Sequence, residues 1–266
     1  MKHLLTLAIK AAIEAGNEIL KVYNGDNATD VVLQKENDTP LTLADQMAHT
    51  SISKNLAYTS YPVLSEEGRD IPYVERAAWE FFWMVDPLDG TKEFLNRNGQ
   101  FTVNIALLRQ NEPVLGVVYQ PTEDVLYFAA EGIGAYKCLA ARTKWVERLD
   151  RLMEQSDKLP VSQQREAYVV VASRSHLSDE TRDFIEQLKV EHPVVEFASI
   201  GSSLKICLVA DGSADIYPRF APTMEWDTAA GDAVVRFAGK QVVDTVNGEP
   251  IKYNKPNLLN SWFIVR

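Results

Sequence analysis

An apolar segment of the chain runs without interruption into two aspartates. Residues 77–86 read AAWEFFWMVD, and the following PLDGT adds a second carboxylate at Asp89. The apolar run predicts a buried strand that ends at Asp86. The next proline fixes the backbone and Gly90 permits a tight turn, so Asp89 and Thr91 are directed back toward the strand end. The fold must therefore place two carboxylates together at the edge of its core.

Two neighbouring carboxylates repel each other unless one is protonated or a cation lies between them. Hard oxygen ligands favour Mg²⁺ or Mn²⁺ over zinc, and the sequence has no competing cluster of His and Cys residues. Peptide N–H groups after Gly90 could also meet a phosphate. The alternative is plain turn or helix-cap chemistry for Asp86 and Asp89.

Three other acidic segments favour the metal interpretation. Glu66 and Glu67 follow a short apolar segment in LSEEG, and Asp227 begins a predicted helix in MEWDTAAG. Asp45 lies three residues after Thr42 at the start of another predicted helix. The sequence therefore offers acids from several distant segments for one site.

Hydrophobic periodicity predicts an α+β fold. A helix is expected over about residues 2–23, where charged residues interrupt the apolar ones and argue against a signal peptide. A second helix follows Pro40, with Thr42 as its N-cap. The segments FTVNIALL, PVLGVVYQ and DVLYFAAEGIGAYK are separated by turn residues and predict an antiparallel sheet in the first half.

Strands and helices alternate in the second half, which predicts α/β structure there, with Ser178 capping its first helix. We expect an N-terminal part over 1–165 with most of the acidic segments and a C-terminal part over 166–266 with the last one. The charged joining stretch 139–165 could form an amphipathic helix. Its apolar face would pack locally or contact a partner or membrane surface. That face would consist of Trp145, Leu149, Leu152 and Met153.

Composition excludes some partners. The formal net charge is −10 and no basic block interleaved with aromatics is present, which argues against binding a nucleic-acid polymer. An acidic surface does not attract an anionic substrate, so cations or a few placed basic groups must do so. Cys138 and Cys207 are far apart and flanked by apolar residues, which predicts buried, reduced thiols and a cytoplasmic protein.

Together these residues resemble the inositol monophosphatase superfamily of lithium-sensitive, Mg²⁺-dependent phosphatases. Its two marks are D-P-x-D-G-T, here DPLDGT at 86–91, and W-D-x-A-A/G, here WDTAAG at 226–231. The E-E pair and the upstream T-x-A-D also match, in order and spacing, over nearly the whole chain. The resemblance implies a layered αβαβα sugar-phosphatase fold.

Finer motifs are similar to one branch, the bacterial 3'(2'),5'-bisphosphate nucleotidases of the CysQ type. These motifs are DGTKEF, NGQFTVNIALL, VASRSH, SIGSSLKICLVADG and YPRF. The branch removes the 3'-phosphate of adenosine 3',5'-bisphosphate, a by-product of sulfate activation, and also acts on the sulfated form. Its members are described as peripheral to the cytoplasmic face of the inner membrane. The resemblance implies a small nucleotide bisphosphate as the substrate.

The resemblance also implies roles for the acids. Glu66, Asp86 and the carbonyl of Leu88 would hold one Mg²⁺, and Asp86, Asp89 and Asp227 would hold a second, with a weaker third site. Two ions about 4 Å apart can clamp the attacking and leaving oxygens of an in-line displacement.

Thr91, hydrogen-bonded to Asp45, would orient the attacking water, and Glu66 or Glu67 would accept its proton. The N–H groups of Gly90 and Thr91 would hold the transferred phosphate. No side chain need be phosphorylated in this scheme.

Structural alternatives stay open for several of these residues. Asp45 could only complete a helix-start box with Thr42, and Thr91 could be a plain N-cap. Glu67 could be solvated, and Asp227 could serve only as a helix cap.

Basic groups would meet the phosphate that the nucleotide keeps. By resemblance, Lys205 and Arg219, with Ser202, would contact this phosphate or the ribose, and His176 would lie near the adenine or ribose. A structural role is the alternative for His176 and for Lys92. The expected substrate contacts are Glu66, Leu88, Asp89, Gly90, Thr91, His176, Ser202, Lys205, Arg219 and Asp227.

Three other functions compete. Haloacid-dehalogenase phosphatases use D-x-D-x-T, one residue shorter than the spacing here, and phosphorylate their first aspartate. Inositol monophosphate or fructose 1,6-bisphosphate could be the substrate within the same superfamily. A non-catalytic nucleotide or metal sensor is the third alternative, although it would not need the water-orienting pair Thr91 and Asp45.

Overall fold

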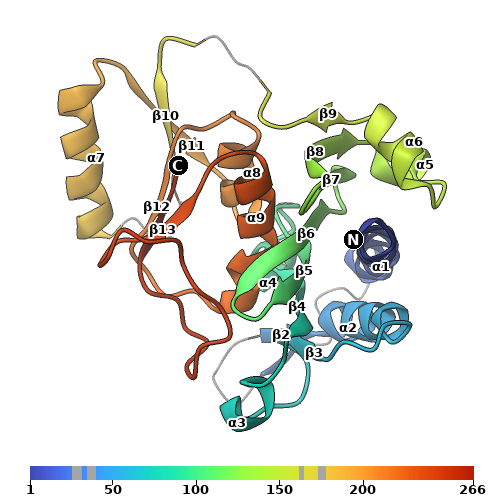
Figure 1. Cartoon of the computed structure of the whole chain (residues 1–266). Coiled ribbons are helices and arrows are strands. Elements are labelled where there is room, and N and C mark those ends of the chain that lie inside the picture. Colours follow the sequence, from blue (N-terminus) through green and yellow to red (C-terminus); the bar gives the residue numbers. More distant parts are fainter. Residues whose placement is uncertain (26–31, 35–39, 162–164, 173–177) are drawn as a thin grey trace.

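The computed structural model describes residues 1–25, 32–34, 40–161, 165–172 and 178–266. Its elements form five layers, with helices on the outside and in the middle and a sheet in each gap (Figure 1). The αβαβα arrangement expected from the resemblance is confirmed. The boundary predicted at residue 165 stays a prediction.

The larger of the two sheet layers is a seven-stranded sheet in the order β3-β4-β5-β6-β7-β8-β9. Every neighbouring pair is antiparallel except β3 and β4, which run parallel. The antiparallel sheet predicted for the first half is therefore confirmed. The strands are β3 (Val63–Ser65), β4 (Phe81–Asp89), β5 (Thr102–Arg109), β6 (Glu112–Gln120), β7 (Val125–Ala130), β8 (Gly134–Leu139) and β9 (Asp157–Lys158).

Two helices cover one face of this sheet, α1 (Lys2–Tyr23) and α2 (Leu43–Leu56). The buried face of α1 packs with α2 and with sheet residues such as Trp83 in one hydrophobic core. Thr42 caps α2, as predicted. Among the described residues, no helix has the length and apolar character that crossing a membrane requires. Short elements in this half are β1 (Val32–Gln34), β2 (Pro40–Thr42), α3 (Tyr73–Arg76) and α4 (Thr91–Leu95).

The joining stretch forms two short helices, α5 (Ala141–Lys144) and α6 (Leu149–Glu154), rather than one. Leu149 and Leu152 are buried, and Trp145 packs partly buried against the same core. Local packing is therefore the interpretation that the described residues of this stretch support. Cys138 and Cys207 are buried, free thiols, as expected.

The second half supplies the remaining layers. Helices α8 (Leu204–Ala210) and α9 (Glu225–Phe237) cover the other face of the seven-stranded sheet. Outside them lie a parallel pair and a three-stranded antiparallel sheet, and α7 (Asp179–Glu191), capped by Ser178, packs outermost. These strands are β10 (Tyr168–Ala172), β11 (Val195–Ser199), β12 (Tyr217–Arg219), β13 (Val242–Asp244) and β14 (Phe263–Val265).

Because Gly116 has no side chain, α9 can pack directly against the sheet. A Cβ atom at this position in β6 would lie 2.2 Å from the carbonyl oxygen of Ala230 and 2.7 Å from Cβ of Ala233. Because real Cβ atoms do not come this close to backbone, any side chain would push α9 away from the sheet. Helix α9 begins with the WD motif, so this contact helps to fix the place of Asp227.

We expect Gly116→Ala to lower the free energy of unfolding by about 1–3 kcal/mol through overpacking. The matched control is Gly132→Ala in the β7–β8 turn. There nothing lies within 4 Å of the new Cβ and only the backbone φ of +76° opposes it, a cost of about 1 kcal/mol. Urea unfolding followed by circular dichroism compares the two. If Gly116→Ala lowers the free energy of unfolding no more than Gly132→Ala does, the close contact at Gly116 does not determine where α9 packs.

Candidate metal and phosphate site

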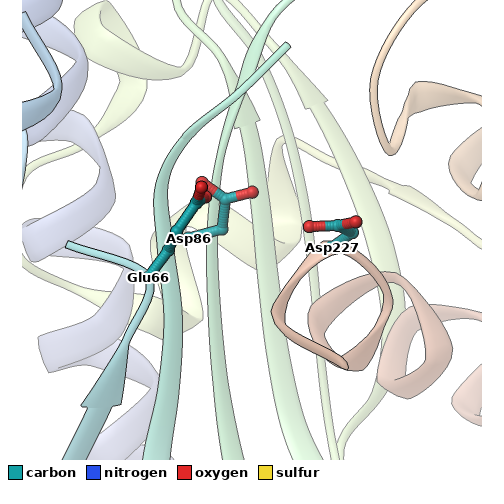
Figure 2. A group of neighbouring side chains, drawn as sticks. All are labelled: Glu66, Asp86 and Asp227. Atoms are coloured by element: carbon teal, nitrogen blue, oxygen red, sulfur yellow. The ribbon is translucent and has the colours of Figure 1, made fainter. Parts of the chain in front are cut away.

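Three carboxylates converge where β3, β4 and α9 meet. Oxygen atoms of Glu66, Asp86 and Asp227 lie within 4.8 Å of one another (Figure 2). The parallel pairing of β3 with β4 sets Ser65 opposite Val85, so Glu66 and Asp86 leave the sheet at the same edge. The first turn of α9 brings the third carboxylate from the far end of the sequence.

The end of β4 has the predicted turn. The pairing with β5 shifts between Asp86 and Asp89, and the N–H of Leu88 donates to Asp86 Oδ1 at 3.1 Å across the irregularity. Gly90 follows with φ of +93°, a left-handed conformation that side chains other than glycine rarely adopt. A Cβ there would also lie 3.2 Å from the carbonyl oxygen of Gln100.

Burial and neighbouring carboxylates raise the pKa of Asp86 and of Asp227. Burial raises the pKa of Asp86 well above its ordinary value, and the charges of Glu66, Asp89 and Asp227 raise it further. Burial, followed by the charge of Asp89, does the same to the pKa of Asp227. A divalent cation would remove this repulsion. Three carboxylates with the nearby carbonyl of Leu88 form the hard oxygen set that suits Mg²⁺ or Mn²⁺.

Asp227 combines two roles that the sequence interpretation kept apart. Its Oδ2 accepts a hydrogen bond from the N–H of Met224 at 2.8 Å, which caps α9. The same carboxylate faces Asp86 in the acidic group (Figure 2). Helix capping and membership of the cluster are therefore compatible.

Asp89 points to a different partner. Its Oδ2 accepts hydrogen bonds from Ser202 Oγ at 2.6 Å and from the N–H of Ser203 at 2.5 Å. Within the part of the chain that the structure describes, the group of carboxylates meeting within 4.8 Å does not include Asp89. Its place as a metal ligand stays a prediction.

The expected hydrogen bond between Thr91 and Asp45 does not form among the described residues. The hydroxyl of Thr91 donates to the carbonyl of Leu88 at 3.4 Å, whereas Asp45 Oδ2 accepts from the hydroxyl and N–H of Thr42 at 2.5 and 2.8 Å. Asp45 thus completes the helix-start box, because these local donors are nearer. The N-cap of α4 is Gly90, so Thr91 is not the cap.

Asp45 is nevertheless close enough to the acidic group to be affected by its charge. It is fully buried, and burial raises its pKa to about 6. The charges of Glu67 and Glu66 raise this pKa further, which places Asp45 within the field of the acidic group. Glu67 is half-buried.

A cleft of about 490 Å³ opens beside the carboxylates. Residues from both halves of the chain line this cleft. An elongated substrate could extend from the acidic group into it. The predicted substrate contacts in its lining are Asp89, Gly90, Ser202, Lys205, Arg219 and Asp227, and Lys92 also lines it. His176 lies outside the residues that the structure describes.

Two of the predicted basic side chains, Lys205 and Arg219, line the cleft. Lys205 is buried and donates to the carbonyl oxygens of Ser202 at 2.7 Å and Ile200 at 3.3 Å, and burial lowers its pKa to about 8. Arg219 donates through Nη2 to the carbonyl of Pro222 at 3.0 Å. Its buried Nε has no hydrogen-bond partner among the described residues, and an anion in the cleft would provide one.

Sequence reasoning missed three buried polar residues behind Asp89. Thr102, Asn104 and Ser203 are buried and hydrogen-bonded to one another. A signal was present in FTVNIALL, where Thr102 and Asn104 fall on one face of an otherwise apolar strand.

Comparisons with known proteins place the whole chain in one family. The model of the inositol monophosphatase family matches residues 1–262. The chain is 45% identical over 268 residues to the 3'(2'),5'-bisphosphate nucleotidase CysQ of Shigella flexneri, covering 98% of this chain and 99% of that protein. The identity and coverage are the same for CysQ of Escherichia coli (strain K12).

Among solved structures, CysQ from Bacteroides thetaiotaomicron is described as a bacterial member of the inositol monophosphatase family. It is 48% identical and matches with a TM-score of 0.91, covering 100% of this chain and 97% of that chain. This chain belongs to the inositol monophosphatase family.

Proposed function

We propose that this protein is a metal-dependent phosphomonoesterase that removes the 3'-phosphate of adenosine 3',5'-bisphosphate, giving AMP and phosphate. The observation that carries the proposal is the acidic group of Glu66, Asp86 and Asp227 beside a cleft with Lys205 and Arg219. CysQ nucleotidases that are 45% and 48% identical over nearly the whole chain support the choice of substrate. Sulfur assimilation is the corresponding cellular role.

Divalent cations are the cofactor in this proposal, two Mg²⁺ ions with a weaker third. Glu66, Asp86 and the Leu88 carbonyl would hold one, and Asp86, Asp89 and Asp227 would hold another. Bound in this way, such ions lower the pKa of water and neutralise charge on the phosphate. The lithium sensitivity of the superfamily and a cytoplasmic location, peripheral to the inner membrane, belong to the same proposal.

The chain's own groups would complete the reaction. The N–H groups of Gly90 and Thr91 would hold the transferred phosphate, since Gly90 lies in the cleft lining and its left-handed turn opens α4. Glu66 would accept the proton of the attacking water. Asp45 would act as a second proton acceptor, because its pKa of about 6 allows it to gain and lose a proton near neutral pH.

The cleft would select the nucleotide. Lys205 and Arg219 would bind the phosphate that is not removed, with Ser202 beside them, and His176 would face the adenine or ribose. Arginine matches phosphate with its planar fork, while lysine acts as a point charge. An inositol monophosphate has only the phosphate that reacts, so it would leave this basic pair unused.

Turnover by Asp89→Asn tests the proposed function. The amide keeps the shape of the side chain and can still accept from Ser202 and Ser203, but it loses the negative charge that a cation needs. We expect kcat for phosphate release from adenosine 3',5'-bisphosphate in Mg²⁺ to fall by at least about 100-fold, with the thermal unfolding temperature unchanged. The matched control is Asp150→Asn, an exposed residue paired with Arg148. Wild-type turnover by Asp89→Asn, or greater wild-type activity on inositol 1-phosphate than on the nucleotide, would contradict the proposal.

Arg219→Ala tests nucleotide recognition separately. We expect KM for adenosine 3',5'-bisphosphate to rise about tenfold or more, the loss of one charge-assisted contact, with little change in KM for inositol 1-phosphate. Arg109→Ala is the control, because Arg109 forms an exposed ion pair with Glu131. Equal increases in KM for both substrates would remove Arg219 from nucleotide recognition.

A further inference from the structure

A row of buried polar side chains joins the end of β4 to the segment that precedes α8. Asp89 is held by Ser202 and Ser203, about 110 residues later in the chain. Behind the serines, Thr102 Oγ1 lies 2.6 Å from Ser202 Oγ and 2.8 Å from Ser203 Oγ. Asn104 Oδ1 accepts from Ser203 Oγ at 2.9 Å and lies 3.1 Å from Thr102 Oγ1. β5 therefore supports both the acid and the segment that holds it.

The acceptors at the two ends fix the direction of these hydrogen bonds. A carboxylate and an amide oxygen only accept, so the Ser202 hydroxyl donates to Asp89 and the Ser203 hydroxyl donates to Asn104. Thr102 is then left to donate to a serine oxygen or to Asn104. When Thr102 donates to Ser202 Oγ, 2.6 Å away, it polarises the Ser202 hydroxyl that bonds to the Asp89 carboxylate, which strengthens both bonds in a site of low dielectric.

The serine segment also lines the substrate cleft. Gly201, Ser202 and Ser203 are part of the cleft wall, and the Lys205 ammonium is tied to the carbonyl of Ser202. Ser202 has φ of +58°, a conformation that a non-glycine residue keeps only where its surroundings hold it. The bonds to Asp89 and Thr102 hold it here. Holding Asp89 in place therefore also holds residues 201–203 of the cleft wall in place, and holding these residues in place also holds Asp89.

We propose that Thr102, Asn104 and Ser203 are positioning residues. They orient the Asp89 carboxylate for a divalent cation and couple cation binding to nucleotide binding in the cleft. The inference rests on the proposed function, because it takes Asp89 as a ligand and the cleft as the nucleotide site. The coupling is positive, since a ligand that orders the serine segment strengthens the bonds that orient Asp89, and it must be equal in both directions.

The test measures Mn²⁺ binding by electron paramagnetic resonance, with and without 3'-deoxyadenosine 5'-monophosphate. This probe keeps a 5'-phosphate for the cleft but has no 3'-oxygen that could reach the cation. In the wild type we expect the probe to tighten Mn²⁺ binding about fivefold. In Thr102→Val we expect Mn²⁺ alone to bind about fivefold more weakly, as for the loss of one hydrogen bond, and the probe to have no effect.

Three further variants complete the test. Thr102→Ser keeps the hydroxyl, so we expect both the Mn²⁺ affinity and the effect of the probe to be those of the wild type. Thr59→Val is the matched control, because its hydroxyl bonds to Trp83 Nε1 and the carbonyl of Leu56, outside the cleft lining, and it keeps both values. We expect Ser203→Ala to weaken Mn²⁺ binding and to abolish the effect of the probe, as Thr102→Val does. If Thr102→Val does not fold, Ser203→Ala tests the proposal in its place.

The outcomes separate the two proposals. Wild-type Mn²⁺ affinity and a wild-type effect of the probe in both Thr102→Val and Ser203→Ala would overturn the inference and leave the proposed function intact. A wild-type protein on which the probe has no effect would overturn the coupling. A wild-type protein that binds no Mn²⁺ would overturn the proposed function itself.

Discussion

The mutual repulsion of buried carboxylates at the end of β4 is the constraint around which the fold is arranged. Asp86 is 1% exposed and lies among acids from β3 and α9. Taking charges out of water without a partner is costly. The folded protein must therefore either protonate these groups or hold a cation among them. The parallel β3–β4 pair, the left-handed Gly90 and the close contact of α9 at Gly116 all bring the acids together. A divalent cation, as proposed, would be the partner that removes this repulsion.

In the proposed function, the two parts of the site would divide the charge of a bisphosphate substrate between them. Cations held by carboxylates would take the phosphate that reacts, and Lys205 with Arg219 would take the one that remains. This division suits a protein with a net charge of −10, which does not draw anions in by its overall field. Because Asp89 hydrogen-bonds to the cleft wall through Ser202 and Ser203, the two parts are also mechanically connected.

Much of this could be predicted from the sequence, because local patterns carried it. The strand that contains Asp86, the helix beginning at the WD motif and the capped α2 all follow from periodicity and turn residues. The predicted end of that strand at Asp86 was wrong, because β4 continues to Asp89 through a register shift. The predicted hydrogen bond between Thr91 and Asp45 was wrong, because Thr42 offers Asp45 nearer donors. No sequence pattern shows which of several possible donors a carboxylate will bind. The polar row behind Asp89 was missed because it joins residues about 100 positions apart. Strands β13 and β14 are three residues each, too short for a periodic signal.

Anomalous diffraction from crystals soaked in Mn²⁺ tests the central claim most directly, because it places the ion independently of any activity. We expect a peak between the carboxylates of Glu66 and Asp86 and a second peak in contact with Asp227. Crystals that show Mn²⁺ peaks elsewhere on the protein but no peak among these three carboxylates would contradict the proposed metal site.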